Sequence, residues 1–375
     1  MMLKRNLGVG AARWQRLHQA AMPGRLTDLG RVRDNPGDLR GLCFVPDGVQ
    51  GPMPLVVVLH GCTQTASVYD HGSGWSTLAA CFGFALLFPE QHRGNNAMLC
   101  FNWFLPDDTR RGSGEAASIK SMIDTMKRDH AIDDTRVFIT GLSAGGAMTS
   151  VMLATYPEQF AAGAILAGLA YGCASGTAEA LDCMAGRSRR TADELVAVVR
   201  RASRHSGAWP RVQVWQGDAD MTVTPGNADA IVAQWTGLHG LSATPDVVDR
   251  VENHPRARWL GAIGKPLIER YTLTGMAHGV PIDPRRGGDD ALGTAGAHML
   301  DVGVSSTLHI AQFFGIDGAA VVAAKPANVP AVVPTAAPVH ARPQQPRTAA
   351  PPSAPPASGV QAVIEKALRA AGLMR

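Results

Sequence analysis

The sequence predicts a doubly wound α/β fold, in which helices cover both faces of a mostly parallel sheet. Continuous apolar runs are typical of parallel strands that are buried on both faces. Six such runs recur along the chain, at residues 54–61, 83–89, 136–140, 161–168, 211–215 and 267–273. Segments with helical composition or periodicity lie between several of them, at residues 75–82, 114–129 and 146–156. This alternation indicates strand–helix–strand units with right-handed crossovers.

The chain is long and apolar enough for a large buried core. It has 375 residues, of which 46% are hydrophobic, and its net charge of +4 does not indicate a nucleic-acid partner. No run of about 18 apolar residues predicts a transmembrane helix, and no secretory signal is visible at the amino terminus. We expect one α/β domain over residues 41–316.

Both ends of the chain extend beyond this domain. Residues 1–40 hold eight Lys and Arg residues against three Asp residues, a net charge of +5. Their periodic apolar positions predict a helix that either docks on the core or seeks a lipid or hydrophobic-granule surface. Residues 317–357 are rich in Pro and Ala and predict an extended linker. Residues 358–375 predict a short amphipathic helix, which needs this molecule, a second copy or a polymer surface to cover its apolar face.

Residues 173–206 interrupt the alternation of strands and helices. Thr191 is followed three positions later by Glu194, a pattern that predicts a capped helix start. We interpret the segment as a helical insertion. It is either a partial lid beside the site or a peripheral excursion.

Six cysteines occur without metal-ligand spacing, so the sequence predicts no metal site. Two interpretations of the cysteines stay open. They are either six mostly buried thiols, or they form one or two disulfides in an oxidising compartment. The pairs to test are Cys62–Cys100 and Cys173–Cys183.

The most informative motif is G-x-S-x-G at residues 141–145, which lies between an apolar strand and a helix. Strand, sharp turn and helix form the context of a nucleophile elbow, which exposes a serine hydroxyl at the start of a helix. The glycines keep side chains away from the strained turn, and the backbone N–H groups there favour a developing negative charge. Ser143 is therefore the candidate nucleophile. The alternative is an ordinary glycine-rich turn of an α/β protein.

A serine hydroxyl needs a base within hydrogen-bond reach, and the base needs a carboxylate that orients it. In this context the carboxylate and then the base follow the serine along the chain, each in a loop after a late strand. The sequence predicts Asp220 as the carboxylate, while its rival Asp218 has a turn-forming alternative role. It predicts His278 as the base, because small residues flank it in a short loop. Three other histidines lie in less suitable settings: His239, His254 and His298.

Two backbone amides are candidates for the oxyanion hole. One is the N–H of Ala144, directly after the nucleophile, and the other is the N–H of Cys62 in the loop after the first long strand. Trp75 and Trp103 are candidate substrate-binding residues for an apolar or ring-bearing acyl group, with ordinary packing as the alternative. The sequence contains no phosphate loop and no dinucleotide fingerprint, so we expect no cofactor.

The chain resembles the polyhydroxybutyrate-depolymerase-type esterases, which are α/β-hydrolases related to feruloyl and acetylxylan esterases. The resemblance covers roughly residues 40–315. Its motifs occur in order as HGC (60–62), GW (74–75), PEQ (89–91), CFNWF (100–104), GE (114–115) and GLSAGG (141–146). It implies hydrolysis of carboxylic esters through an acyl-enzyme, with Ser143, Asp220 and His278 as the catalytic triad.

We therefore expect a serine esterase that acts on poly(3-hydroxyalkanoate), 3-hydroxybutyrate oligomers or similar esters. The alternatives are a feruloyl or acetylxylan esterase, a related peptide hydrolase or acyltransferase, and a non-catalytic protein that binds polymer granules. Many members of the family are secreted, but this chain shows no signal segment and no recognisable large substrate-binding domain. Both an extracellular and a cytoplasmic location stay open, and the terminal helices would replace a binding domain on a polymer-granule or membrane surface.

Overall fold

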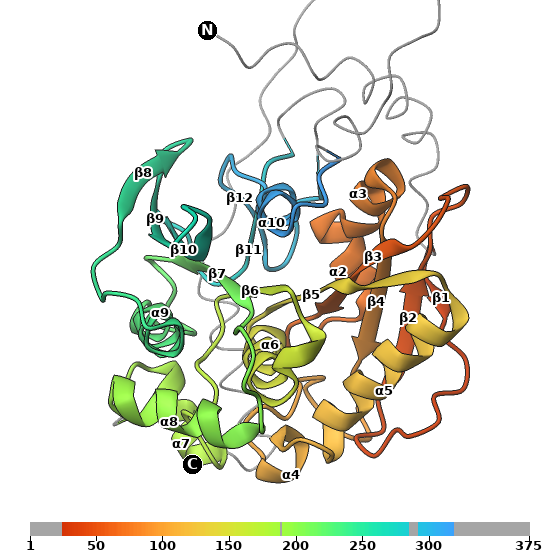
Figure 1. Ribbon diagram of the computed structural model, residues 1–375, viewed down its shortest axis with the longest axis horizontal. Coiled ribbons are helices and arrows are strands. Elements are labelled where there is room, and N and C mark those ends of the chain that lie inside the picture. Colours follow the sequence, from red (N-terminus) through yellow and green to blue (C-terminus); the bar gives the residue numbers. More distant parts are fainter. Residues whose placement is uncertain (1–24, 188–189, 285–291, 319–375) are drawn as a thin grey trace, which may run out of the picture. The chain divides into compact units, whose positions relative to one another are not determined.

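The computed structural model describes residues 25–187, 190–284 and 292–318 of the chain (Figure 1). A ten-stranded mixed sheet has the strand order β1-β2-β4-β3-β5-β6-β7-β10-β9-β8. Its strands are β1 (Thr27–Asp28), β2 (Arg40–Phe44), β3 (Met53–Leu59), β4 (Ala85–Glu90), β5 (Ile132–Leu142), β6 (Ala162–Leu166), β7 (Arg211–Gly217), β8 (Val247–Val251), β9 (His254–Leu260) and β10 (Pro266–Leu273). The six neighbouring strands from β4 to β10 are parallel to one another, whereas β1, β2, β8 and β9 pair in the antiparallel sense.

The predicted doubly wound architecture is confirmed. The six expected apolar runs form the six parallel strands, which are β3, β4, β5, β6, β7 and β10. Strand β3 shows why these runs are apolar throughout. Its side chains alternate between the two faces of the sheet, and those of Leu55, Val56, Val57, Val58 and Leu59 are all completely buried.

Helices cover both faces of the sheet, and each layer encloses one hydrophobic cluster (Figure 1). The first layer contains α5 (Gly114–Asp129), α6 (Ala144–Thr155), α7 (Thr177–Met184), α8 (Ala192–Ala202) and α9 (Gly226–His239). The second layer contains α2 (Ala66–Ser73), α3 (Trp75–Phe82) and α10 (Ser306–Phe314). The predicted helix ranges 75–82 and 114–129 coincide with α3 and α5.

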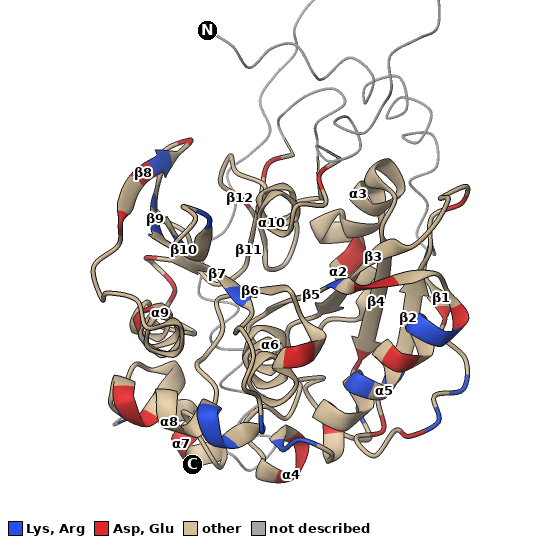
Figure 2. Cartoon of the chain, in the orientation of Figure 1, with Lys and Arg blue, Asp and Glu red and all other residues tan. Residues whose placement is uncertain are grey.

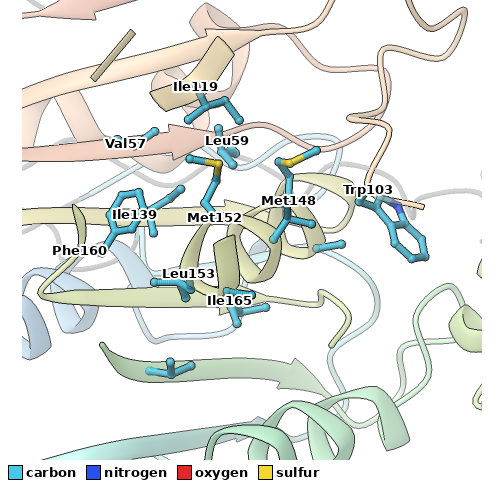
Figure 3. Close-up of a cluster of buried hydrophobic side chains, with 14 of the residues drawn as sticks. Val57, Leu59, Trp103, Ile119, Ile139, Met148, Met152, Leu153, Phe160 and Ile165 are labelled. Atoms are coloured by element: carbon cyan, nitrogen blue, oxygen red, sulfur yellow. The ribbon is translucent and has the colours of Figure 1, made fainter. Parts of the chain in front are cut away.

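Helix α6 lies at the centre of its layer. It carries no charged residue, all of its residues are buried, and it packs between α5 and α8. Figure 3 shows Met148, Met152 and Leu153 of this helix packed beside Ile139 of β5 and Ile165 of β6. Charged residues instead occur on α4 (Pro106–Thr109), α5, α7, α8 and the β8–β9 ribbon (Figure 2). The elbow helix is therefore anchored by apolar packing along its whole length.

The sheet begins before the predicted domain boundary at residue 41. Thr27 pairs with Cys43, and Asp28 pairs with Leu42, so β1 is already an edge strand of the fold. The Gly37 N–H donates to Ser118 Oγ of α5 at 2.8 Å. A two-residue strand is too short to produce an alternating pattern in the sequence.

The segment 173–206 contains the two helices α7 and α8, and the predicted capping box at Thr191 and Glu194 is present. Its interpretation as a partial lid stays a prediction. The expected helix before residue 25, the linker after residue 318 and the expected helix over residues 358–375 lie outside the described residues. In the described residues, no helix is both long and apolar enough to cross a membrane.

Candidate active site

Ser143 occupies a strained turn between β5 and α6. Its backbone dihedrals are φ 57° and ψ −117°, which a non-glycine residue adopts only where the surrounding structure enforces them. Its N–H donates to the Leu166 carbonyl oxygen at the end of β6, and its carbonyl oxygen accepts from the Ala147 N–H of α6. Ser143 is partly exposed although its neighbours Leu142 and Ala144 are buried. The turn thus presents the serine to solvent at the amino terminus of a helix.

The two glycines of the motif allow close backbone contacts that no side chain would permit. A Cβ atom on Gly145 would lie 2.4 Å from the Leu59 carbonyl oxygen and 2.5 Å from the His60 carbonyl oxygen. A Cβ atom on Gly141 would lie 2.4 Å from the Gly145 carbonyl oxygen. Because all three contacts are with backbone atoms, they cannot be relieved by a side-chain rotation. The motif therefore brings the start of α6 directly against the end of β3.

Asp220 and His278 form a hydrogen-bonded pair. Asp220 Oδ2 lies 2.7 Å from His278 Nδ1, and the two side chains are 0% and 10% exposed. Asp220 Oδ1 also accepts from the N–H groups of Thr222 and Val223 at 2.8 and 2.9 Å, and Oδ2 accepts from Gln216 Nε2 at 3.2 Å. These donors hold the carboxylate in one orientation, so its bond to His278 fixes which ring nitrogen carries the proton. Gln216 therefore helps to orient the Asp220 carboxylate, a role that the sequence pattern does not indicate.

The sheet brings Ser143 and this pair to the same edge. The strands that precede Ser143, Asp220 and His278 are β5, β7 and β10, all parallel, with only β6 between β5 and β7. Adjacent strands are about 4.8 Å apart, so the ends of β5 and β7 lie about 10 Å apart, a span that the side chains and the imidazole can cover. Among the described residues, the Ser143 hydroxyl makes no hydrogen bond.

The rival residues have structural contacts instead. Asp218 Oδ1 accepts from the Gly275 N–H at 2.7 Å, so it fastens the loop that carries His278. His254 bonds to the Thr274 N–H and to the Val302 carbonyl oxygen. His239 Nε2 lies 3.0 Å from the Pro210 carbonyl oxygen, and burial lowers its pKa.

The two amides predicted for the oxyanion hole flank the contact between α6 and β3. Within the described part of the chain, neither the Cys62 N–H nor the Ala144 N–H has a hydrogen-bond acceptor. Ala144 begins α6, where the helix dipole favours negative charge. A disulfide joins Cys62 to Cys100, which confirms the first of the two candidate pairs. It ties the loop after β3 to the loop that contains Trp103.

A buried carboxyl group supports these two loops. Glu115 Oε1 accepts from Gln91 Nε2 at 2.6 Å, and its Oε2 accepts from the Asn102 N–H at 2.8 Å. The Gln91 N–H in turn donates to His60 Nε2 at 3.1 Å, so His60 Nδ1 carries the proton and donates to the Gly61 carbonyl oxygen. Burial lowers the pKa of His60 and raises the pKa of Glu115 to about 8, although the donors to Glu115 oppose the latter shift. This role of Glu115 cannot be recognised from the sequence, because an acid in the first turn of a helix is common.

The two tryptophans have different positions. Trp75 is 1% exposed and packs edge-on against Phe84 in the second hydrophobic cluster, so the structure places it in the core and not in a substrate site. Trp103 is 9% exposed, lies in the loop held by the Cys62–Cys100 disulfide, and contacts Phe104 edge-on. In Figure 3 it lies at the margin of the first cluster, beyond Met148 of α6. Trp103 remains a candidate for substrate contact.

The second candidate cysteine pair consists of thiols. Cys173 and Cys183 are buried, and Cys183 Sγ donates to the Cys173 carbonyl oxygen at 3.0 Å. The hydrogen bond from Cys183 and burial together raise the pKa of Cys173, which keeps this thiol protonated and unreactive. No cluster of three potential metal ligands occurs in residues 25–187, 190–284 and 292–318.

Comparison with known proteins places this site in an esterase family. The family described as esterase PHB depolymerase matches residues 40–251, which is more than half of the chain. Poly(3-hydroxyalkanoate) depolymerase C of Paucimonas lemoignei is 47% identical over 294 residues, which are 78% of this chain and 70% of that protein. An acetylxylan esterase of Coprinopsis cinerea is 33% identical over 265 residues, which are 69% of this chain and 70% of that protein.

A solved structure confirms the α/β-hydrolase fold. The acetyl xylan esterase from Aspergillus awamori superimposes with a TM-score of 0.66 at 25% sequence identity. The match covers 78% of this chain and 100% of that one. The architecture that positions the elbow is therefore shared with an esterase of known structure.

Substitution of Gly145 tests the close approach of α6 to β3. We predict that Gly145→Ala lowers the free energy of unfolding by about 2 kcal/mol, because the new Cβ must push backbone atoms apart. Urea denaturation measures the change. Gly226→Ala, at the start of α9, is the matched control, since a Cβ there meets no atom within 4 Å. It should be neutral or stabilising by about 0.5 kcal/mol, and equal effects of the two substitutions would contradict the steric argument.

The buried carboxyl of Glu115 predicts a pH-dependent stability. The folded state retains this proton up to a pKa of about 8, whereas the unfolded chain loses it near 4.5. The folded state therefore binds more protons in this window, and the free energy of unfolding falls as the pH rises, by up to about 1.4 kcal/mol per pH unit. We predict that Glu115→Gln removes this fall, as measured by urea denaturation at about pH 5, 6.5 and 8.

Glu158→Gln is the control for the Glu115 experiment. The hydrogen bonds from Arg111 help to lower the pKa of Glu158 below its usual 4.5, so its contribution to stability is lost only as the pH falls below that value. This variant should keep the wild-type slope between about pH 5 and 8. An unchanged slope in Glu115→Gln would show that Glu115 is ionised throughout this range.

Proposed function

This chain belongs to the esterase PHB depolymerase family, and from this membership and its site we propose that it hydrolyses poly(3-hydroxyalkanoate) or 3-hydroxyalkanoate oligomers with Ser143, Asp220 and His278. Membership of this family identifies the chain as a serine ester hydrolase. This identification excludes the alternative of a non-catalytic granule-binding protein. The observation that carries the assignment of the residues is the 2.7 Å bond between Asp220 and His278, at the sheet edge where Ser143 is held in a strained turn.

The proposed reaction begins with Ser143 Oγ attacking the ester carbonyl carbon while His278 Nε2 takes the serine proton. Asp220 stabilises the imidazolium that forms, through its hydrogen bond to Nδ1. The Cys62 and Ala144 amides donate to the oxyanion of the tetrahedral intermediate. The intermediate collapses, His278 returns the proton to the leaving alkoxide, and the alcohol departs from the acyl-enzyme.

Water then releases the acid by the same steps. His278 Nε2 takes a proton from the water as its oxygen attacks the acyl carbon, and the second tetrahedral intermediate is held by the same two amides. Collapse of this intermediate breaks the bond to Ser143 Oγ, which regains its proton from His278.

The proposed substrate class rests on the similarity to the protein from Paucimonas lemoignei. That protein is a poly(3-hydroxyalkanoate) depolymerase and is 47% identical, whereas the acetylxylan esterase is 33% identical over a shorter range. An acetylxylan-type activity is the second candidate, favoured by the structural match to an acetyl xylan esterase. Contact of the terminal segments with a polymer-granule or membrane surface is also a proposal. It rests only on their sequence patterns.

Removal of the nucleophile tests the assignment of the triad. We predict that Ser143→Ala lowers kcat on 4-nitrophenyl butyrate by at least about 10⁴-fold, because no acyl-enzyme can form, while the melting temperature is unchanged or higher. Loss of the strained elbow serine costs the fold nothing, since alanine makes the same backbone contacts. Ser206→Ala, at an exposed serine, is the control and should keep wild-type turnover. Turnover by Ser143→Ala near the wild-type rate would refute the assignment.

A substrate panel tests the proposed specificity. We predict that kcat/KM is at least about tenfold higher on soluble 3-hydroxybutyrate trimer than on acetylated xylan or methyl ferulate, a difference in transition-state binding of about 1.4 kcal/mol. Chromatography of the released acids gives the rates. The Ser143→Ala protein is the blank for every substrate. Faster release of acetate from xylan than of 3-hydroxybutyrate from the trimer would favour the acetylxylan-type activity instead.

A further inference from the structure

A second histidine, His298, lies against the proposed catalytic base. The rings of His278 and His298 meet edge to face, with their centroids 5.9 Å apart and their planes at 79°. His298 Nδ1 lies 3.3 Å from the His278 carbonyl oxygen. Because a carbonyl oxygen only accepts, the His298 Nδ1 carries the proton and donates it. One side chain therefore contacts both the ring and the backbone of His278.

The backbone of His298 fastens the same loop from the other side. Its carbonyl oxygen accepts from the Val280 N–H at 2.8 Å, at the start of the pairing between β11 (Val280–Ile282) and β12 (Met299–Asp301). A Cβ on Gly279 would lie 2.8 Å from this carbonyl oxygen, so the glycine between His278 and Val280 permits the close approach. His298 therefore contacts the loop on both sides of Gly279, through its side chain at His278 and through its carbonyl oxygen at Val280.

His298 is itself held in an uncommon backbone conformation. Its φ is 61°, in the left-handed region that few non-glycine residues adopt. The neighbouring Met299 is 4% exposed and pairs with Gly296 in a tight turn, and its side chain packs on Gly72 of α2. The fold therefore maintains a costly conformation at the residue that touches His278, and such strain is concentrated at functional sites.

We propose that His298 is a positioning residue that holds the His278 imidazole in the orientation needed for proton transfer. The proposal rests on the proposed function of His278. One hydrogen bond, from Nδ1 to Asp220, holds the His278 ring, and the ring can still tilt about this bond. The His298 ring, which meets the His278 ring edge to face, limits this tilt, and its Nδ1–H holds the His278 backbone. A displacement of the base by about 1 Å can reduce the rate by about 100-fold.

The test uses two esters with the same 3-hydroxybutyryl group and different leaving groups. The ethyl ester needs a proton from His278 to release ethoxide, whereas the 4-nitrophenyl ester releases a stable anion that needs little help. Both esters need His278 to take the Ser143 proton, but only the ethyl ester also needs it to protonate the leaving group. We therefore expect His298→Ala to lower kcat/KM by about tenfold on the ethyl ester and by only about threefold on the nitrophenyl ester. A purely structural role would reduce both rates equally, in proportion to the loss of folded protein.

His298→Asn is the conservative variant. The asparagine amide nitrogen takes the place of Nδ1 as the donor to the His278 carbonyl oxygen, and asparagine tolerates the left-handed backbone. We expect it to restore at least about half of the lost rate on the ethyl ester. Wild-type rates in His298→Ala, equal losses on both esters, or no recovery in His298→Asn would each overturn the proposal.

Two further variants separate this proposal from the proposed function. If wild-type protein does not hydrolyse either ester, or if Ser143→Ala and His278→Ala retain activity, the proposed function itself fails. If those two variants are inactive and His298→Ala behaves as wild type, only the positioning role fails. Circular dichroism confirms that each variant is folded.

Discussion

The direct backbone contact between helix α6 and strand β3 is the constraint on which the site depends. Gly145 lies so close to the carbonyl oxygens of Leu59 and His60 that no side chain fits between them. This contact places the amino terminus of α6 beside the loop that carries the Cys62 amide. The strained turn at Ser143 then exposes a hydroxyl at the same point. The apolar packing of α6 along its whole length offsets the strain.

The polar groups around this contact are of two kinds: buried groups that hold loops in place, and the partly exposed side chains proposed to react. Asp220 and Glu115 are fully enclosed and accept several hydrogen bonds, so each holds a loop in one position. Ser143 and His278 are partly exposed, which is consistent with their proposed contact with a substrate. The Cys62–Cys100 disulfide adds a covalent tie between the two loops that Glu115 supports. Rigid surroundings of this kind fix the orientation of donors before the reaction starts.

The sequence was sufficient for the parallel strands, for the sharp turn at Ser143 and for the placement of Asp220 and His278 in loops that meet, because each depends on local pattern and on strand order. The sequence was not sufficient for features that depend on which side chains the folded chain buries and brings together. The composition around Trp75 does not reveal that α3 turns this ring into the core. Glu115 resembles any acid at a helix start, and only the folded chain shows which donors converge on it. His298 reaches His278 through the pairing of two three-residue strands, which leave no periodicity in the sequence.

We propose that Ser143 is the activated nucleophile. Reaction of the folded protein with an alkyl fluorophosphonate, followed by intact mass measurement and peptide mapping, tests it most directly. We expect a single adduct, on the peptide that contains Ser143. An unmodified folded protein, or an adduct on a different residue, would contradict it.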